Sequence, residues 1–437
     1  MSVIDTQFVP DKNKYITHLR EMVSIPTISE KEHYKSESFD AFNSMLKKNY
    51  PLTFSRAEEI PVGNGTFLCI KGSNPVSPLM LMSHKDVVHE GKKKWKSPPF
   101  EGKVINGKMY GRGTFDCKGS LLCLFEATES LLSEGYELKE DLYILSTSNE
   151  EIAGNDAPDA VKYLKDKGIV PGLLIDEGGA ILKIPFPSKV KDIAMIGAVE
   201  RSSARLIFDC LEGINAKKTG KSITKKKYGH FEITPEVEEL AKGLGKYLKF
   251  PVGTVFGALA KHKSLGKAIL THAGSDARAF CGASTGYGVP KNDDAPDAKN
   301  PLRISVSGNY YNKLDELVDQ VIKTASDMGL KLISSTAREA DTPVSSSSKG
   351  FAFITETAKD VFDSIAVLPY PVLGRTDARY FVGYAEEVIR FIPLEISLSQ
   401  MMKFHCPNEN IYVDSLAPAV KFYREAIKKY NADRKEG

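Results

Sequence analysis

Three buried apolar runs in this sequence stop at residues that can bind a metal ion or move a proton. His84 follows the run LMLM, with Asp86 two residues later, the Glu150–Glu151 pair follows DLYILST, and the Asp176–Glu177 pair ends GLLI. Imidazole nitrogens and carboxylate oxygens are ligands that zinc accepts, at roughly 2.0 to 2.2 Å per bond. These residue types indicate metal-assisted hydrolysis, provided that the fold brings them together.

Alternating strands and helices must position these side chains. Uninterrupted apolar runs are typical of strands covered on both faces, and we expect such strands near 79–82, 141–147 and 172–175. Helices ending near 133 and covering 157–167 separate them, which predicts right-handed crossovers in one mostly parallel sheet. Ligands of such sheets bind beyond the carboxyl ends of the strands. The three groups are therefore expected at a single edge.

A fourth carboxylate, Asp116, lies in the glycine-rich turn GKMYGRGTFDCKGS just before a helix. A carboxylate on a rigid turn is suited to bridge two ions about 3.5 to 4 Å apart. Glu150 and Glu151 are adjacent and cannot point the same way at a strand end, so one can bind metal while the other meets the water. A single histidine is more often a core or surface residue, and paired glutamates usually face solvent. What favours a functional site is that all of these residues are expected at the same edge of the sheet.

The length of 437 residues predicts two domains, or one domain with a large insertion. From about residue 197 the pattern of predicted secondary structure changes to long loops with a few strands and helices. This pattern is typical of a small two-layer α+β insert. We expect an α/β catalytic domain, with a mostly parallel sheet flanked by helices, over 1–198 and 346–437. The inserted lid domain is expected over 199–345.

Composition excludes some function classes. The net charge of +3, from 59 basic and 56 acidic residues, argues against a nucleic-acid binder. The start lacks a signal-peptide pattern, and no run approaches the roughly 18 apolar residues of a membrane span, so we expect a cytoplasmic protein without a membrane partner. Six cysteines without a CxxC pair predict neither a disulfide framework nor a thiolate zinc site.

Two competing motifs fail in context. TGKS at 219–222 resembles the end of a phosphate loop, but Asn215 stands where the earlier glycine is required. GASTG at 282–286 matches the letters of a nucleophile elbow, but no apolar strand leads into it and no helix can follow it. Ser284 is therefore predicted to be a loop residue.

Six motifs in order resemble the di-zinc metallopeptidase family that includes carboxypeptidase S, aminoacylase and the N-acyl-amino-acid hydrolases. The motifs are SHKDVV, GRGTFDCKG, SNEEIAG, LLIDEGG, GRTDARYF and FHCPNENIYV. The resemblance covers residues 16 to about 200 and 350 to the end. It implies two zinc ions, with cobalt or manganese as substitutes, bound by His84, Asp116, Glu151, Asp176 and His405.

The resemblance also implies individual roles. Asp116 bridges the two ions, Glu150 is the general base, and Asp86 orients His84, a partner that metal-bound histidines generally need. Related enzymes differ over which acid of the Asp176–Glu177 pair binds metal, and the spacing from Glu151 favours Asp176. The motif GRTDARYF places Thr376, Asp377 and Arg379 at the substrate floor.

The chain departs from the family pattern at several positions. Cys117 replaces the usual methionine, Asn149 the usual aspartate, and Cys406 follows the last ligand, where a thiol can compete for soft metals. The lid lacks the usual Gly-His-Ser-Ser motif, whose histidine steadies the oxyanion in dimeric members. Asn215 falls roughly where that histidine would be, and His230 is an alternative.

The resemblance implies a zinc hydrolase that cleaves an amide bond next to a free carboxylate, in short peptides or N-acyl amino acids. Its expected partners are these small substrates and a second copy of the chain, bound through the inserted domain. The alternative is a catalytically silent metal-binding relative that acts as a binding protein. Glu150 discriminates between them, because a pure metal site has no use for a carboxylate that is not a ligand.

Overall fold

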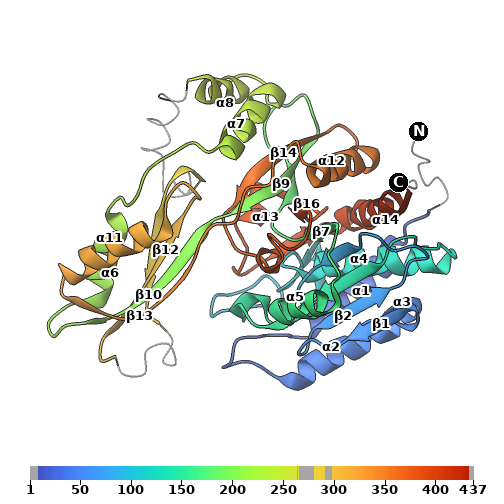
Figure 1. Cartoon of the computed structure of the whole chain (residues 1–437), viewed down its shortest axis with the longest axis horizontal. Coiled ribbons are helices and arrows are strands. Elements are labelled where there is room, and N and C mark those ends of the chain that lie inside the picture. The colour runs from blue at the N-terminus through green and yellow to red at the C-terminus, as the bar shows by residue number, and fades with distance from the viewer. Residues whose placement is uncertain (1–7, 263, 265–279, 291–297, 433–437) are drawn as a thin grey trace. The chain divides into compact units, whose positions relative to one another are not determined.

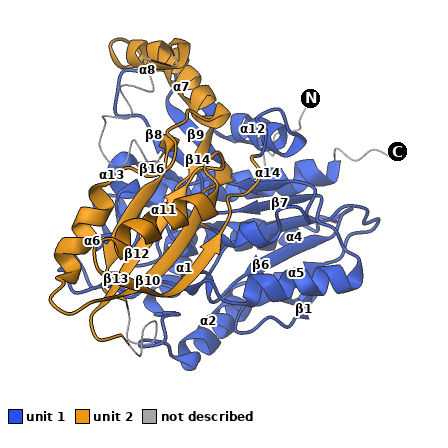
Figure 2. Cartoon of the chain, turned by 60° about the vertical axis from the view of Figure 1, so that its left-hand side comes forward, with its two compact units in different colours: residues 1–197, 344–368, 376–437 blue, residues 198–343, 369–375 orange. Residues whose placement is uncertain are grey.

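The computed structural model of the chain describes residues 8–262, 264, 280–290 and 298–432. It divides into two compact units: unit 1 comprises 1–197, 344–368 and 376–437, and unit 2 comprises 198–343 and 369–375 (Figure 2). The segment 369–375 was predicted to belong to the catalytic domain, but it clusters with unit 2. Among the described residues, no helix combines the length and the apolar character needed to cross a bilayer.

The central sheet contains ten described strands, and its middle is parallel. Figure 1 shows labelled strands and helices of unit 1, among them β2, β7, α4 and α5. Its order is β1-β2-β6-β3-β7-β15-β9-β8-β16, with β14 paired to β9. Strands β6, β3, β7 and β15 run parallel to one another, whereas β1, β2 and β9 pair antiparallel with their neighbours. The predicted α/β class is confirmed, with antiparallel pairs flanking the parallel centre. The strands are β1 (Ala57–Ile60), β2 (Thr66–Ile70), β3 (Leu79–Met82), β6 (Leu142–Ser146), β7 (Leu173–Asp176), β8 (Ala180–Lys183), β9 (Asp192–Glu200), β14 (Ile365–Val372), β15 (Val388–Arg390) and β16 (Glu395–Ser397).

Helices cover both faces of this sheet because its strands are apolar on both sides. Leu79 and Leu81 of β3 belong to one core and Met80 and Met82 to the other. The first core packs against α1 (Lys12–Ser24), α2 (Ser36–Asn49), α4 (Lys118–Ser133), α12 (Lys349–Val361) and α14 (Leu416–Ala432). The second packs against α5 (Asp156–Lys167) and the 3-10 turn η3 (Asp377–Tyr380). The remaining unit 1 elements are α3 (Pro51–Arg56), β4 (Lys103–Ile105), β5 (Lys108–Tyr110), η1 (Glu150–Ile152), α13 (Leu398–Met401), β17 (Asn410–Tyr412) and η4 (Val413–Ser415).

Unit 2 is a four-stranded antiparallel sheet with helices packed on its apolar face. The order is β11-β12-β10-β13, and the core joins Phe208 and Ile304 of the sheet to Ile223 and Leu317 of two helices. Its elements are β10 (Ser202–Cys210), α6 (Ala216–Lys225), α7 (Pro235–Tyr247), α8 (Val252–Lys261), β11 (Ser284–Gly288), β12 (Pro301–Gly308), α11 (Leu314–Ser326) and β13 (Leu330–Arg338). The prediction that Ser284 is a loop residue is wrong, since Ser284 begins β11.

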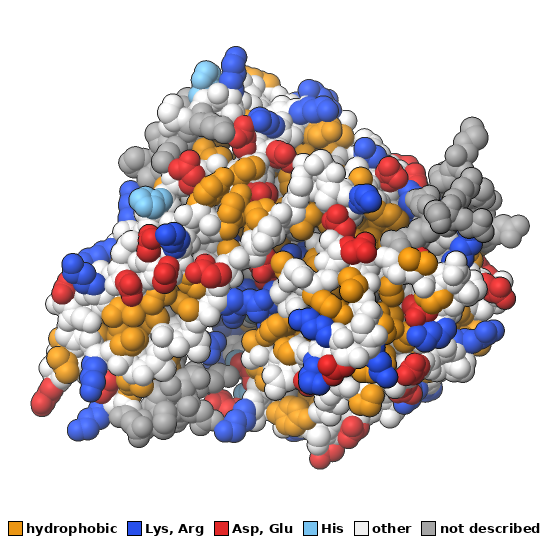
Figure 3. All heavy atoms as spheres, in the orientation of Figure 1, with side chains coloured by type: hydrophobic (Ala, Val, Ile, Leu, Met, Phe, Trp, Pro, Cys, Tyr) orange, Lys and Arg blue, Asp and Glu red, His pale blue; other side chains and the backbone are white. Residues whose placement is uncertain are grey.

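Acidic and basic side chains are interspersed on the face drawn in Figure 3. This mixture agrees with the near balance of 59 basic and 56 acidic residues.

Candidate metal centre

Three neighbouring strands deliver their carboxyl ends to one edge of the central sheet. Strands β6, β3 and β7 are adjacent and parallel, with Leu81 paired to Ile144 on one side and Ile175 on the other. His84 follows β3, η1 follows β6, and Asp176 is the last residue of β7. The apolar runs therefore position the polar residues as the sequence predicted.

Asp116 contacts two imidazoles, and each imidazole also contacts a second carboxylate, which defines two triads: Asp116, His84 and Glu177, and Asp116, His405 and Glu151. Oδ1 of Asp116 lies 2.9 Å from Nε2 of His84, and Oδ2 lies 3.1 Å from Nε2 of His405. The His84 nitrogen is also 3.5 Å from Oε1 of Glu177, and the His405 nitrogen is 2.9 Å from Oε2 of Glu151. The edge of a zinc tetrahedron with bonds of roughly 2.1 Å is about 3.4 Å long. The donor spacing and the nitrogen–oxygen ligand set therefore fit two zinc-class ions with Asp116 between them.

The electrostatics of the cluster also favour bound cations. Burial raises the pKa of Glu151 to about 7, with the Asp116 carboxylate adding to the effect, and burial raises the pKa of Glu177 well above its usual value. Burial also tends to raise the pKa of Asp116, but hydrogen bonds from His405 and His84 hold it well below its usual range. Buried negative charge in excess of its partners is costly, and divalent cations would neutralise it.

Asp86 lies beneath the cluster and is fully buried. Its backbone carbonyl is 2.9 Å from Nδ1 of His84 and its Oδ1 is 3.4 Å away. A carbonyl can only accept, so Nδ1 donates to it, and Nε2 is the nitrogen that could bind a metal ion in place of the proton it shares with Asp116. The Asp86 carboxylate accepts the backbone N–H groups of Glu150 at 3.2 Å and Glu151 at 3.1 Å. Asp86 therefore positions both His84 and the turn η1.

Asp176, the carboxylate that the sequence favours as a ligand over Glu177, contacts the backbone of η3, and its role as a ligand stays a prediction. Oδ2 of Asp176 accepts the backbone N–H of Ala378 at 2.8 Å. Among the described residues, the ligand atoms of two metal-competent clusters lie within 4.8 Å of one another: His84–Asp116–Glu151 and His84–Cys117–Glu177. Neither cluster includes Asp176. Glu177, the open alternative, has its carboxylate beside His84. Because Asp176 ends the strand, its side chain takes a partner in η3, while the next residue turns toward the triad.

Glu150 lies next to Glu151 but outside both triads. Its side chain is 10% exposed, and Nη1 of Arg379 donates to its Oε1 at 3.5 Å. Burial raises the pKa of Glu150 well above the usual value of a glutamate. A buried carboxylate of high pKa beside a metal-competent cluster is suited to take up a proton.

Thr376, Asp377 and Arg379, the predicted substrate floor, lie in unit 1 and are almost completely buried. Nη1 of Arg379 donates to the carbonyl of Thr376 at 2.7 Å, and Nη2 donates to the hydroxyl of Tyr380 at 3.2 Å. Arg379 thus links the carboxylate of Glu150 to Thr376 and Tyr380. Substrate contact by these three residues stays a prediction.

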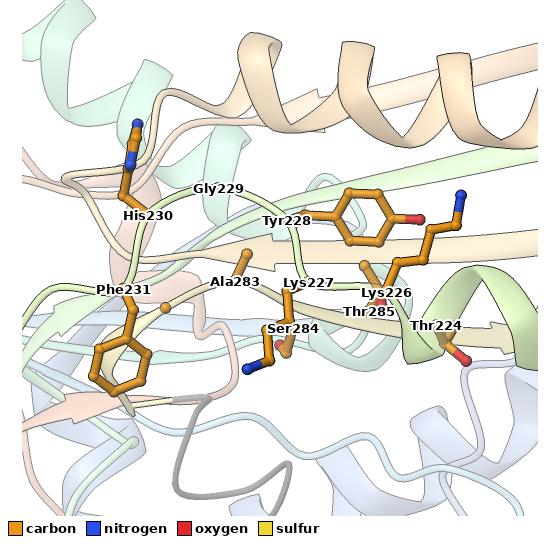
Figure 4. A pocket seen from close by; sticks show the side chains of 11 residues that line it. Thr224, Lys226, Lys227, Tyr228, Gly229, His230, Phe231, Ala283, Ser284 and Thr285 are labelled. Atoms are coloured by element: carbon orange, nitrogen blue, oxygen red, sulfur yellow. The ribbon is translucent and has the colours of Figure 1, made fainter. Parts of the chain in front are cut away.

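The two lid residues lie in unit 2. Oδ1 of Asn215 accepts the backbone N–H of Lys218 at 2.9 Å and caps helix α6. The exposed His230 lines a pocket of about 130 Å³ together with Lys227 and Ser284, and its side chain is directed away from the middle of the pocket (Figure 4). The catalytic use of Asn215 or His230 stays a prediction.

Sequence reasoning missed Glu409, which lies within FHCPNENIYV only four residues after His405. Its buried carboxylate accepts four N–H groups of the turn that carries Asp116: Arg112 Nη1 at 2.7 Å, Gly113 N at 3.1 Å, Phe115 N at 2.9 Å and Asp116 N at 3.2 Å. One side chain therefore ties the Asp116 turn to the His405 segment. The only sequence signal was its closeness to His405.

We expect Glu409→Gln to weaken metal binding, because an amide oxygen accepts less strongly and an amide NH₂ faces donors. Loss of such a supporting contact typically costs about 10- to 100-fold in metal affinity. Competition titration with a chelator measures the change, with the exposed Glu58→Gln as the control. Equal affinity in all three proteins would mean that the turn holds its shape without this carboxylate.

Comparison with known proteins gives consistent matches. A family model described as "Peptidase family M20/M25/M40" matches residues 80–429. The N-fatty-acyl-amino acid synthase/hydrolase PM20D1 of Mus musculus is 26% identical over 99% of this chain and 90% of its own length. Carboxypeptidase S of Saccharomyces cerevisiae is 23% identical over 96% and 84%. The M20 family metallo-carboxypeptidase Sso-CP2 of Sulfolobus solfataricus superposes with a TM-score of 0.66 at 19% identity, covering 95% of this chain and 99% of that chain.

Proposed function

Because the chain belongs to peptidase family M20/M25/M40, we propose that it is a two-metal hydrolase that cleaves an amide bond next to a free carboxylate. The mouse relative is named for N-fatty-acyl amino acids and the yeast relative for carboxypeptidase activity. These names support two substrate classes, N-acyl amino acids and short peptides. Both carry an amide nitrogen one carbon away from a carboxylate.

The observation that carries this proposal is that the two carboxylate oxygens of Asp116 contact two different imidazoles, those of His84 and His405. One ion would be held by His84, Asp116 and Glu177, and the other by Asp116, Glu151 and His405. Zinc ions held by these residues would polarise the amide carbonyl and lower the pKa of bound water toward about 7. The family is metal-dependent, and zinc rather than cobalt or manganese is our proposal for the ion.

We assign the proton transfers of the reaction to Glu150. Its carboxylate would accept a proton from the attacking water and pass it to the departing amine nitrogen. Asp86 fixes the backbone of Glu150, and Arg379 holds one carboxylate oxygen. The other oxygen is then left to exchange the proton. A silent metal-binding relative would gain nothing from this arrangement.

A substrate screen tests the proposal directly. With zinc added, N-acyl amino acids and dipeptides should be hydrolysed, and the methyl esters of the same compounds, which lack the free carboxylate, should react about tenfold more slowly or worse. Released amine is the readout, and His84→Ala serves as the metal-site control. Equal rates for acid and ester would remove the carboxylate requirement. If the metal-loaded protein turned over none of these compounds, the proposed hydrolase activity would be contradicted.

A further inference from the structure

A second metal-competent cluster includes a thiol. Sγ of Cys117, a ring nitrogen of His84 and a carboxylate oxygen of Glu177 all lie within 4.8 Å of one another. Cys117 has no exposed surface and directly follows Asp116. The bridging carboxylate and this thiol therefore come from consecutive residues at the start of helix α4.

The thiol that the sequence singled out for soft metals was a different one, Cys406. The structure leaves Cys406 exposed, and neither metal-competent cluster of the described residues contains it. Cys117, noted only as a replacement for methionine, is the sulfur that lies at the centre. A methionine there could offer a thioether, but not the anionic sulfur that a cysteine can provide.

The contacts of Cys117 suit a sulfur ligand. Oγ of Ser83 lies 2.7 Å from its Sγ, and either atom can be the donor. The same hydroxyl donates to the Cys117 carbonyl at 3.0 Å. Once the sulfur is deprotonated, the hydroxyl can rotate its single proton to the sulfur, which is the kind of supporting contact that metal ligands usually have. Ser83 is the residue before His84, so one backbone segment positions both the imidazole and the partner of the thiol.

The numbers of donors on the two sides of Asp116 differ. His84, Glu177 and Cys117 form one cluster, and Asp116 contacts His84, so these four residues would supply the number of protein donors that a tetrahedral zinc site needs. Asp116, Glu151 and His405 make three, which leaves a position open. The His405 side chain is also 53% exposed, whereas that of His84 is 1% exposed. The open position therefore falls on the side that solvent reaches.

Resting on the two-metal site proposed above, we propose that Cys117 is a fourth protein ligand of the ion held by His84, Asp116 and Glu177. When the ion binds, the S–H bond breaks, a sulfur–metal bond forms and the proton leaves to solvent. A thiolate favours zinc, cobalt and cadmium over manganese, whose preferred ligands are oxygen atoms. This position of the centre thus selects for zinc-class ions, unlike a position with oxygen and nitrogen ligands alone.

Cobalt(II) loading of the full-length protein tests the thiol directly, because a cobalt–thiolate bond gives a charge-transfer absorption in the near ultraviolet. We expect this band in the wild type and in Cys406→Ser, the matched control that removes the thiol next to His405. We expect no band in Cys117→Ser and Cys117→Met. In competition titrations, the preference for zinc over manganese should fall about tenfold or more in both Cys117 variants.

Each outcome decides the matter. A wild type that binds cobalt but lacks the band overturns the ligand role of Cys117 and leaves the two-metal hydrolase standing. A wild type that binds no cobalt or zinc overturns both proposals. Loss of the band in Cys406→Ser, or its retention in either Cys117 variant, assigns the sulfur elsewhere. If Cys117→Ser fails to fold, Cys117→Met and the wild-type spectrum still decide.

Discussion

Glu150→Gln is expected to lose hydrolytic rate by at least roughly 10²- to 10⁴-fold, the contribution of general acid–base catalysis, while keeping its metals. The amide cannot take a proton from water at neutral pH. Its oxygen can still accept from Arg379, and its backbone N–H still donates to Asp86, so the turn η1 should hold. Turnover number on the best substrate of the screen, measured beside metal content, gives the answer.

The control is Glu58→Gln, which makes the same chemical change at an exposed position of strand β1 outside the cluster. It should behave as the wild type. A Glu150→Gln variant that turns over at nearly the wild-type rate would mean that another group activates the water. A variant that loses metal along with activity would place Glu150 among the ligands instead.

Metal content should fall in a pattern that follows the two triads. Asp116→Ala should have the largest effect, because its two oxygens serve both imidazoles. His84→Ala and His405→Ala should each lower the content from up to two zinc-class ions to roughly one. Elemental analysis of the purified proteins measures this. Equal metal content in the wild type and both histidine variants would contradict the assignment of His84 and His405 as metal ligands.

Asp176 and Glu177 supply a matched pair for the same measurement. Glu177→Gln should lose metal on the His84 side, since it removes a charged donor 3.5 Å from the imidazole. Asp176→Asn should keep both ions, because the amide oxygen can still accept from Ala378. The reverse result would return the ligand role to Asp176, which the spacing along the sequence favoured.

The sequence by itself determined the class of the fold and the place of the centre. Apolar runs such as Leu79–Met82 predict strands because burial on both faces demands apolar residues throughout. Polar residues directly after such runs must then lie at the strand ends, and three adjacent parallel strands bring those ends together. The Gly-rich turn before α4 predicts a rigid position for Asp116, but not which strand ends it meets.

Local patterns failed where they were weak. Strand β11 has the sequence STGYG, which carries no clear apolar alternation. This strand forms because β12 supplies its hydrogen-bonding partner, as in the pairing of Thr285 with Val306. Such long-range pairing overrides local propensity.

Only the tertiary structure decided which atoms of the centre meet. The contact of Glu409 with the Asp116 turn joins residues 293 positions apart, and the contact of Arg379 with Glu150 joins residues 229 apart. No local pattern encodes such distances. The choice between Asp176 and Glu177 likewise depends on the direction of two neighbouring side chains, which the packing of β7 against η3 sets. Residue types and strand ends follow from nearby residues, whereas partners across the fold follow from how the whole chain packs.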